Sequence, residues 1–200
     1  MMEGKSNEEI ACGIAKCYVS QRILLSHTHH RYRAERELHM PTPTIRIAVN
    51  ADDDRLVEAI IDQQEYEREL HDTRLPGAQI GRSYLEYLKT KVAAGNGALL
   101  VAELNGAFVG YAACWIEHDN NVAETEDSNH FGYVADTYIV PQLRGRGLVA
   151  SLLESAEQCI RQNHVSRIRI AGLANNQSAL RAYAKYGFGN YEIVMEKRLR

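Results

Sequence analysis

The chain has 200 residues, enough for one domain with an extension or for two small domains. Apolar residues make up 45% of it and charged residues 24%, as is usual for a globular protein. The net charge of −3 argues against a general nucleic-acid binder, and no apolar run approaches the roughly 20 residues that a membrane span needs.

Residues 1–41 are predicted to be an extension that precedes the domain. Gln21 and Arg22 interrupt their apolar stretch, and no small-residue cleavage site follows, so they are not a signal peptide. No cysteine or carboxylate pattern completes a metal site around the histidines of this extension, so we expect no metal. These histidines are His27, His29, His30 and His39. Met40 reads as a natural domain start, so residues 1–41 are an accessory segment or an upstream reading-frame extension, and residues 42–200 are the functional domain.

The first half of this domain is predicted to hold one strand and two helices. Residues 44–49 alternate with β-branched side chains and predict a strand. The acidic residues 52–54 suit the start of a helix, because carboxylates cap its free N–H groups and complement its dipole. Pro76 and Gly77 end that helix, and apolar residues at helical spacing predict a second one over residues 83–94.

The second half is predicted to be rich in strands. Two apolar runs within residues 98–116 flank Asn105-Gly106, a pair typical of a tight hairpin turn. A strand over 131–140, a helix over 148–160, a strand over 167–173, a helix over 178–187 and a final strand over 191–197 follow. The order β-α-α-β-β-β-α-β-α-β predicts an α/β (α+β) fold, a mixed sheet with helices on its faces.

The turn between the strand over 131–140 and the next helix has the features of an anion-binding site. The first N–H groups of a helix are unpaired, and the helix dipole places partial positive charge there. Gly145 and Gly147 let the backbone approach an anion closely, and Arg144 and Arg146 add positive charge. The turn is neither a Walker A loop nor a complete dinucleotide fingerprint.

This turn resembles the acetyl-CoA signature of the GNAT superfamily of N-acetyltransferases, Arg/Gln-x-x-Gly-x-Gly/Ala after a strand that ends near a proline. Two registers fit: one begins at Gln142, and the other runs Arg144, Gly147, Val149. We prefer the second because of its distance from Pro141, although Val149 stands where the family has a small residue.

A second motif of the same family lies further along the chain. The family pattern is Asn-x-x-Ala followed by a tyrosine four residues before Gly-Phe. The residues at those spacings are Asn176, Ala179, Tyr183, Gly187 and Phe188. By order of elements the resemblance extends over about 44–197, and it implies a mostly antiparallel sheet whose central strands splay apart.

The resemblance implies a binding site for acetyl-CoA as co-substrate. Residues 144–149, including Leu148, would hold its pyrophosphate, and Asn176 would lie in the cofactor site. The backbone of Tyr138, Ile139 and Val140 would pair with the pantetheine arm. Tyr183 would also contact the cofactor and steady the leaving thiolate, although it could instead simply pack its helix against the sheet.

Asp136 is the candidate catalytic carboxylate, because it lies in an otherwise apolar strand and an unpaired buried carboxylate is unfavourable. It would accept the proton of the amine, or it could be structural. Glu103 and His130 are weaker alternatives.

The sequence indicates the residues that would contact the amine acceptor less clearly than those that would bind the cofactor. Glu65, Glu69 and Tyr84 are the candidate acceptor contacts. Further candidates are Glu67, Tyr66 and the acidic loop residues Glu124, Glu126 and Asp127. A run of acidic residues can equally be a solvated helix face.

These features predict an N-acetyltransferase that moves acetyl from acetyl-CoA directly to a primary amine of a small molecule, protein or peptide. The alternative is a non-catalytic acyl-CoA-binding sensor or interaction module. The four cysteines (Cys12, Cys17, Cys114 and Cys159) show neither a disulfide framework nor zinc spacing, which favours reduced thiols and a cytoplasmic protein. The resemblance is compatible with a homodimer.

Overall fold

The structure, a computed structural model, describes residues 42–199, which belong to one compact unit. The four histidines and the two cysteines of the extension lie outside the described residues. The strands are β1 (Thr44–Ile47), β2 (Ala98–Leu104), β3 (Ala107–His118), β4 (His130–Ile139) and β5 (Ile168–Ile170). The α-helices are α2 (Asp53–Leu70), α3 (Gly77–Ala94), α4 (Glu126–Asn129), α5 (Leu148–Arg161) and α6 (Gln177–Tyr186), with 3-10 turns at Asn50–Asp52 and Pro141–Leu143.

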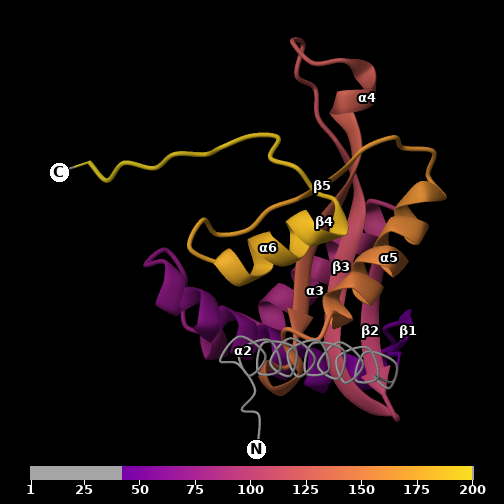
Figure 1. Ribbon diagram of the computed structural model, residues 1–200, viewed down its shortest axis with the longest axis vertical. Helices are drawn as coiled ribbons and strands as arrows, with labels where there is room; N and C mark the ends of the chain where they lie inside the picture. Colours follow the sequence, from indigo (N-terminus) through magenta and orange to yellow (C-terminus); the bar gives the residue numbers. More distant parts are fainter. Residues whose placement is uncertain (1–41, 200) are drawn as a thin grey trace, which may run out of the picture. The chain divides into compact units, whose positions relative to one another are not determined.

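The strands form one sheet in the order β1-β2-β3-β4-β5 (Figure 1). The first four are antiparallel, and β5 is parallel to β4. β5 pairs only with Gly132–Val134 of β4, whereas β4 continues to Ile139. The two strands therefore diverge, which confirms the predicted mixed sheet with splayed central strands and leaves the second half of β4 with an open edge.

Helices cover both faces of the sheet (Figure 1). On one face, the apolar stripe of α5 and Tyr183 of α6 pack against Leu100 and Val134. On the other face, α2 and α3 pack against Val101 and Tyr111. A helix with apolar residues at i, i+3 and i+4 buries one stripe in this way, which is why the periodicity of these segments predicted them.

A β-bulge in β4 decides which face its polar residues reach. Ala113 pairs with Asp136, but its neighbour Cys114 pairs with Val134, so Ala135 is an extra residue in β4. Side chains alternate between the faces of a strand, and a bulge shifts that alternation by one. Val134 therefore packs on the α5 face, whereas Asp136 turns to the α2 and α3 face.

Three predicted elements differ from the structure. The second helix begins at Gly77 rather than at residue 83, because Pro76 takes the N-cap position instead of separating two segments. β5 is shorter than predicted because the chain leaves β4 after Ile170. The prediction of a final strand over 191–197 was wrong: residues 188–199 lie outside any helix or strand, and the edge of β5 that such a strand would need is only three residues long.

None of the helices that the structure describes combines the length and the apolar character required to cross a membrane.

Candidate active site

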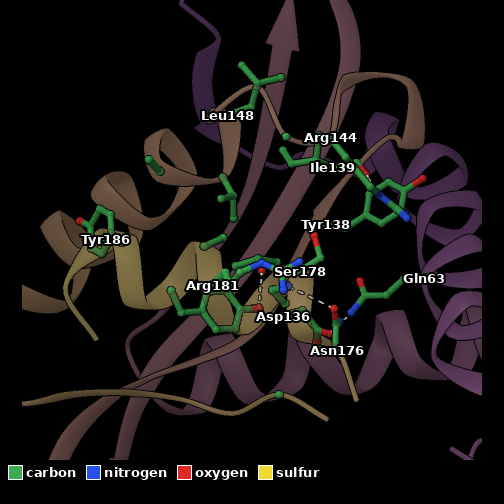
Figure 2. Close-up of a pocket in the computed structure, with 18 of the residues that line it drawn as sticks. Gln63, Asp136, Tyr138, Ile139, Arg144, Leu148, Asn176, Ser178, Arg181 and Tyr186 are labelled. Atoms are coloured by element: carbon green, nitrogen blue, oxygen red, sulfur yellow. Dashed lines mark hydrogen bonds between the residues drawn. The ribbon is translucent and has the colours of Figure 1, made fainter. Parts of the chain in front are cut away.

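A cleft of about 550 Å³ opens where β4 and β5 diverge. Its walls come from α2, the second half of β4, the glycine turn, the start of α5, the segment after β5, and α6. Figure 2 shows Gln63 reaching from α2 toward Asp136, with Arg181 and Tyr186 of α6 across the cleft. Elements far apart in the sequence thus meet at the open edge of one strand.

The glycine turn presents bare backbone to this cleft. Gly145 and Gly147 have φ angles of 74° and 83°, in the left-handed region that disfavours side chains. A Cβ added to either glycine would meet nothing within 4 Å, so neither glycine is required for packing inside the protein. Gly147 is the N-cap of α5, whose first N–H groups have no partner within the helix. The turn therefore offers donors and open space together.

The two arginines of the turn lie differently from one another. Arg146 is exposed to solvent. The Arg144 side chain turns toward α2: its Nε donates to the Ile139 carbonyl over 2.9 Å, and its guanidinium lies 3.6 Å from the Asp62 carboxylate. It also lies 5.0 Å from the centre of the Tyr66 ring. Arg144 thus closes one end of the open edge of β4.

The open edge belongs to Thr137 and Ile139. Val140 N donates to Val109 O over 3.0 Å, so the backbone of Val140 faces β3. Because backbone groups alternate along an antiparallel strand, Tyr138 also faces β3 and Ile139 faces the cleft, where its carbonyl accepts from Arg144. Of the three residues predicted to pair with pantetheine, only Ile139 therefore has its backbone groups toward the cleft, and Thr137, which the sequence analysis did not include, faces it in the same way.

Tyr183 and Asn176 both line the cleft. The Tyr183 hydroxyl lies 2.9 Å from Thr137 Oγ1, and burial raises the pKa of this tyrosine. Asn176 caps α6, with its side-chain oxygen accepting from Ala179 N over 3.2 Å. Arg181 and Lys185, on the same helix, add positive charge that the motif alone did not indicate.

Asp136 lies at the inner wall of the cleft and is only 8% exposed. Gln63 Nε2 donates to Oδ1 over 2.9 Å, and the Tyr84 hydroxyl donates to Oδ2 over 2.9 Å. Burial raises the pKa of this carboxyl to about 6, and the two hydrogen bonds oppose that shift because they stabilise the ionised form. Asp136 therefore changes its charge close to neutral pH.

This raised pKa makes the stability of the protein depend on Asp136. Between its ordinary pKa and about 6, the native state binds more protons at Asp136 than the unfolded state, so its contribution to stability is lost as pH rises through that range. Asp136→Asn removes the titration. The difference in free energy of unfolding between the variant and wild type should therefore change in favour of the variant by about 3 kcal/mol as the pH rises from about 4 to about 7. Urea unfolding at both pH values tests this, and a difference independent of pH would contradict it.

The predicted acceptor residues are only partly brought together. Tyr84 is held on Asp136, as described. Glu65 instead accepts from Gly77 N over 2.6 Å and pairs with Arg68, and Glu69 is exposed, so neither lines the cleft. The residues of α2 that do line it are Gln63, Tyr66 and Glu67. Helical spacing from the buried Leu56 and Ile60 could have indicated Gln63 and Glu67, which lie one and two turns further on the same side.

The remaining candidates lie elsewhere. Glu103 pairs with Arg46 over 2.7 Å, and His130 packs against His118 at the far end of β4. Two of the loop acids have other partners, and the third, Glu126, is exposed. Asp127 pairs with Arg167, and Glu124 accepts from Ser128 and Tyr191. Neither of these acids lines the cleft.

The fold is shared with solved acetyltransferase structures. The chain is 20% identical to a predicted acetyltransferase from Clostridium acetobutylicum crystallised with acetyl-CoA, with a TM-score of 0.59 over 78% of this chain and 96% of that one. It is 16% identical to an aminoglycoside 6'-N-acetyltransferase from Acinetobacter haemolyticus, with a TM-score of 0.58 over 78% and 98% of the two chains. At these identities the likeness establishes the fold.

Sequence relatives and a family model point the same way. An uncharacterized N-acetyltransferase from Archaeoglobus fulgidus is 29% identical over 75 residues, which are 38% of this chain and 48% of that protein. One from Bacillus subtilis is 27% identical over 77 residues, 38% and 49% of the two proteins. The aligned part of the chain thus spans about half the length of both curated relatives. A model of the acetyltransferase (GNAT) family matches residues 49–188, which is more than half of the chain, and the chain therefore belongs to this family.

Proposed function

We propose that the protein transfers acetyl directly from acetyl-CoA to a primary amine, with residues 42–200 as the catalytic domain. The observation that carries this proposal is the position of Asp136, a buried carboxyl with a pKa of about 6 beside the open edge of β4. A sheet edge and a helix start can bind a ligand without catalysis. A titratable carboxylate at the inner end of the same cleft provides for proton removal as well.

The cleft has the donors that acetyl-CoA would require. The bare turn at Gly145 and Gly147 and the free N–H groups of α5 suit a pyrophosphate. Ile139 and Thr137 offer a strand edge to an amide-containing arm. Arg181 and Lys185 line the cleft and can pair with a further phosphate. When bound, acetyl-CoA supplies an acetyl thioester and a thiolate leaving group.

Asp136 would take the proton of the acceptor amine. An amine such as a lysine side chain has a pKa near ~10.4 and arrives protonated, so it needs a proton acceptor before or during its attack. Asp136 is ionised above about pH 6 and can hold this proton on either carboxylate oxygen, each of which keeps a free lone pair. Activity should therefore fall as the pH drops below about 6.

Within residues 42–199, the cysteines favour direct transfer over a route through an acyl-cysteine. Cys114 is fully buried on the α5 face, and burial raises the pKa of its thiol to about 11. Burial also raises the pKa of Cys159. The thiolate is the nucleophilic form, so both thiols are poorly suited to attack a thioester at neutral pH.

Tyr183→Phe tests the proposed role of the Tyr183 hydroxyl at the leaving group. A hydrogen bond to a charged group contributes about 1.5–3 kcal/mol, so kcat should fall about 10- to 100-fold. The affinity for acetyl-CoA, measured by calorimetry, should stay within about twofold. Tyr191→Phe is the control, because it removes a tyrosine hydroxyl that donates to Glu124 outside the cleft. An equal loss of affinity and turnover in Tyr183→Phe would make Tyr183 a packing residue.

The function itself is tested by thiol release from acetyl-CoA, with and without amines. A panel of polyamines, aminoglycosides, amino acids and peptides spans small-molecule and peptide acceptors. Aminoglycosides belong in it because some of the similar structures are aminoglycoside acetyltransferases. Release of thiol only when an amine is supplied would establish that the protein is an acetyltransferase. Binding of acetyl-CoA without release by any amine supports the alternative, an acyl-CoA sensor.

A further inference from the structure

The side chain of Gln63 lies between a buried tyrosine and the carboxylate of Asp136. Tyr111 is fully buried in β3, and its hydroxyl donates to Gln63 Oε1 over 2.8 Å. The other end of the same amide, Nε2, donates to Asp136 Oδ1 over 2.9 Å and lies 3.4 Å from Glu67 Oε1. Gln63 comes from α2, so three elements meet at this one side chain.

The chemistry of these neighbours permits only one orientation of the Gln63 amide. An ionised carboxylate accepts hydrogen bonds and cannot donate them. The end of Gln63 that faces Asp136 and Glu67 must therefore be the NH2 group. The opposite end is then the carbonyl, and a tyrosine hydroxyl can donate to it. If the amide were reversed, its oxygen would face two carboxylates. Its NH2 group would face the Tyr111 hydroxyl, and the hydrogen bond that this hydroxyl donates to Gln63 would be lost.

We propose that Tyr111 is a positioning residue, which donates its hydroxyl proton to Gln63 Oε1 and thereby holds the Gln63 NH2 group against Asp136. This inference rests on the proposed role of Asp136 as the proton acceptor. Tyr111 does not contact the cleft itself and acts through Gln63. Its role is to keep a donor on the carboxylate, which favours the ionised form that can accept a proton from the amine.

Other groups also act on the charge of Asp136, from every element packed around it. Tyr84 donates to Oδ2, the negative charge of Glu67 favours the protonated form, and Arg74 favours the ionised form. Arg74 is itself paired with Glu67 over 2.7 Å, which limits the repulsion between the two carboxylates. The neighbouring tyrosines of β4 and α6 are Tyr133 and Tyr183. Within this group, Gln63 is the side chain whose effect would reverse with its orientation.

The test measures the pKa of Asp136 directly. Protein labelled with 13C at the aspartate carboxyl carbon is titrated by NMR, and the Asp136 signal is assigned by its absence in Asp136→Asn. Tyr111→Phe keeps the ring and removes the hydroxyl. Because Gln63 then loses its anchor, the pKa of Asp136 should rise by about half a unit to one unit. Tyr191→Phe removes a hydroxyl that donates to Glu124 and should leave the pKa of Asp136 unchanged.

Gln63→Leu provides a second variant and a double-mutant cycle. It removes the NH2 donor from a half-buried position, so the pKa of Asp136 should rise at least as much as in Tyr111→Phe. If Tyr111 acts through Gln63, adding Tyr111→Phe to Gln63→Leu should produce no further shift. Additive shifts, or an unchanged pKa in Tyr111→Phe, would overturn the proposal.

The pH profile of kcat/KM separates this inference from the proposed function. If both hold, the acidic limb of the profile in Tyr111→Phe moves to higher pH by the same amount as the pKa of Asp136. If the pKa moves and the limb does not, Tyr111 still positions Gln63, but Asp136 is not the base. A packing role for Tyr111 alone predicts lower stability with the pKa of Asp136 unchanged.

Discussion

Asp136→Asn should lower kcat/KM for amine acetylation by about 100- to 10 000-fold, the range usual for the loss of a general base. Asparagine keeps the size of the side chain and both hydrogen-bonding contacts, with Gln63 donating to its oxygen and its NH2 donating to Tyr84. It cannot accept the amine proton. The residual activity of the variant should no longer decrease when the pH is lowered past about 6, because the carboxyl that titrates there is gone. Initial rates of thiol release from pH 5 to pH 9 measure both effects.

The affinity of the same variant for acetyl-CoA should be close to that of wild type. Asp119→Asn makes the same chemical change at an exposed carboxylate and should leave both the rate and the pH profile intact. A loss below about tenfold in Asp136→Asn, with the acidic limb preserved, would show that another group accepts the proton. The buried carboxylate would then be structural.

Gly147→Asp should lower the affinity for acetyl-CoA by about 100-fold or more while the protein stays folded. The new carboxylate would lie at the free N–H groups of α5, where a pyrophosphate is expected. Two like charges about 5 Å apart repel by roughly 3 kcal/mol at an effective dielectric constant of 20, which corresponds to about 100-fold. Calorimetric titration with CoA measures the loss.

A matched control separates this repulsion from backbone strain. Gly106, in the β2–β3 hairpin, has a φ of 78°, close to the 83° of Gly147, and an added Cβ would meet nothing within 4 Å at either position. Gly106→Asp therefore introduces the same charge and similar strain away from the cleft, and its affinity for CoA should match wild type. If both variants bind CoA as wild type does, the turn does not hold the pyrophosphate.

Features set by neighbours in the sequence were predicted well. Asn105-Gly106 indicated the hairpin because a two-residue turn depends only on its own backbone angles. The glycine turn was predicted for the same reason: Gly145 and Gly147 need conformations that other residues rarely adopt. The apolar stripes of α2 and α5 were predicted because helical periodicity reports which side is buried.

Features set by distant partners were not predicted. The final strand failed because a strand needs an edge, and the sequence does not show that β5 leaves the sheet after Ile170. The bulge at Ala135 depends on its register with β3, so Asp136 could be identified as unusual without its face being known. Gln63 lies 73 residues from Asp136, and no local pattern joins them. Glu65 and Glu69 seemed equivalent to Glu67 in sequence, although only Glu67 lines the cleft.

The bulge in β4 has a consequence for how such a protein can change over evolutionary time. Asp136 and Thr137 are adjacent in the chain, yet the first bonds to side chains of α2 and α3 and the second to Tyr183 of α6. Under the proposed mechanism, the group that would take the amine's proton lies on one side of the strand and the group that would meet the thiol on the other. Substitutions in α2 and α3 would then change the acceptor without disturbing the thiol side. Alternation of side chains along one strand, with its phase set by the bulge at Ala135, would in this way make acceptor choice and thioester chemistry separately adjustable.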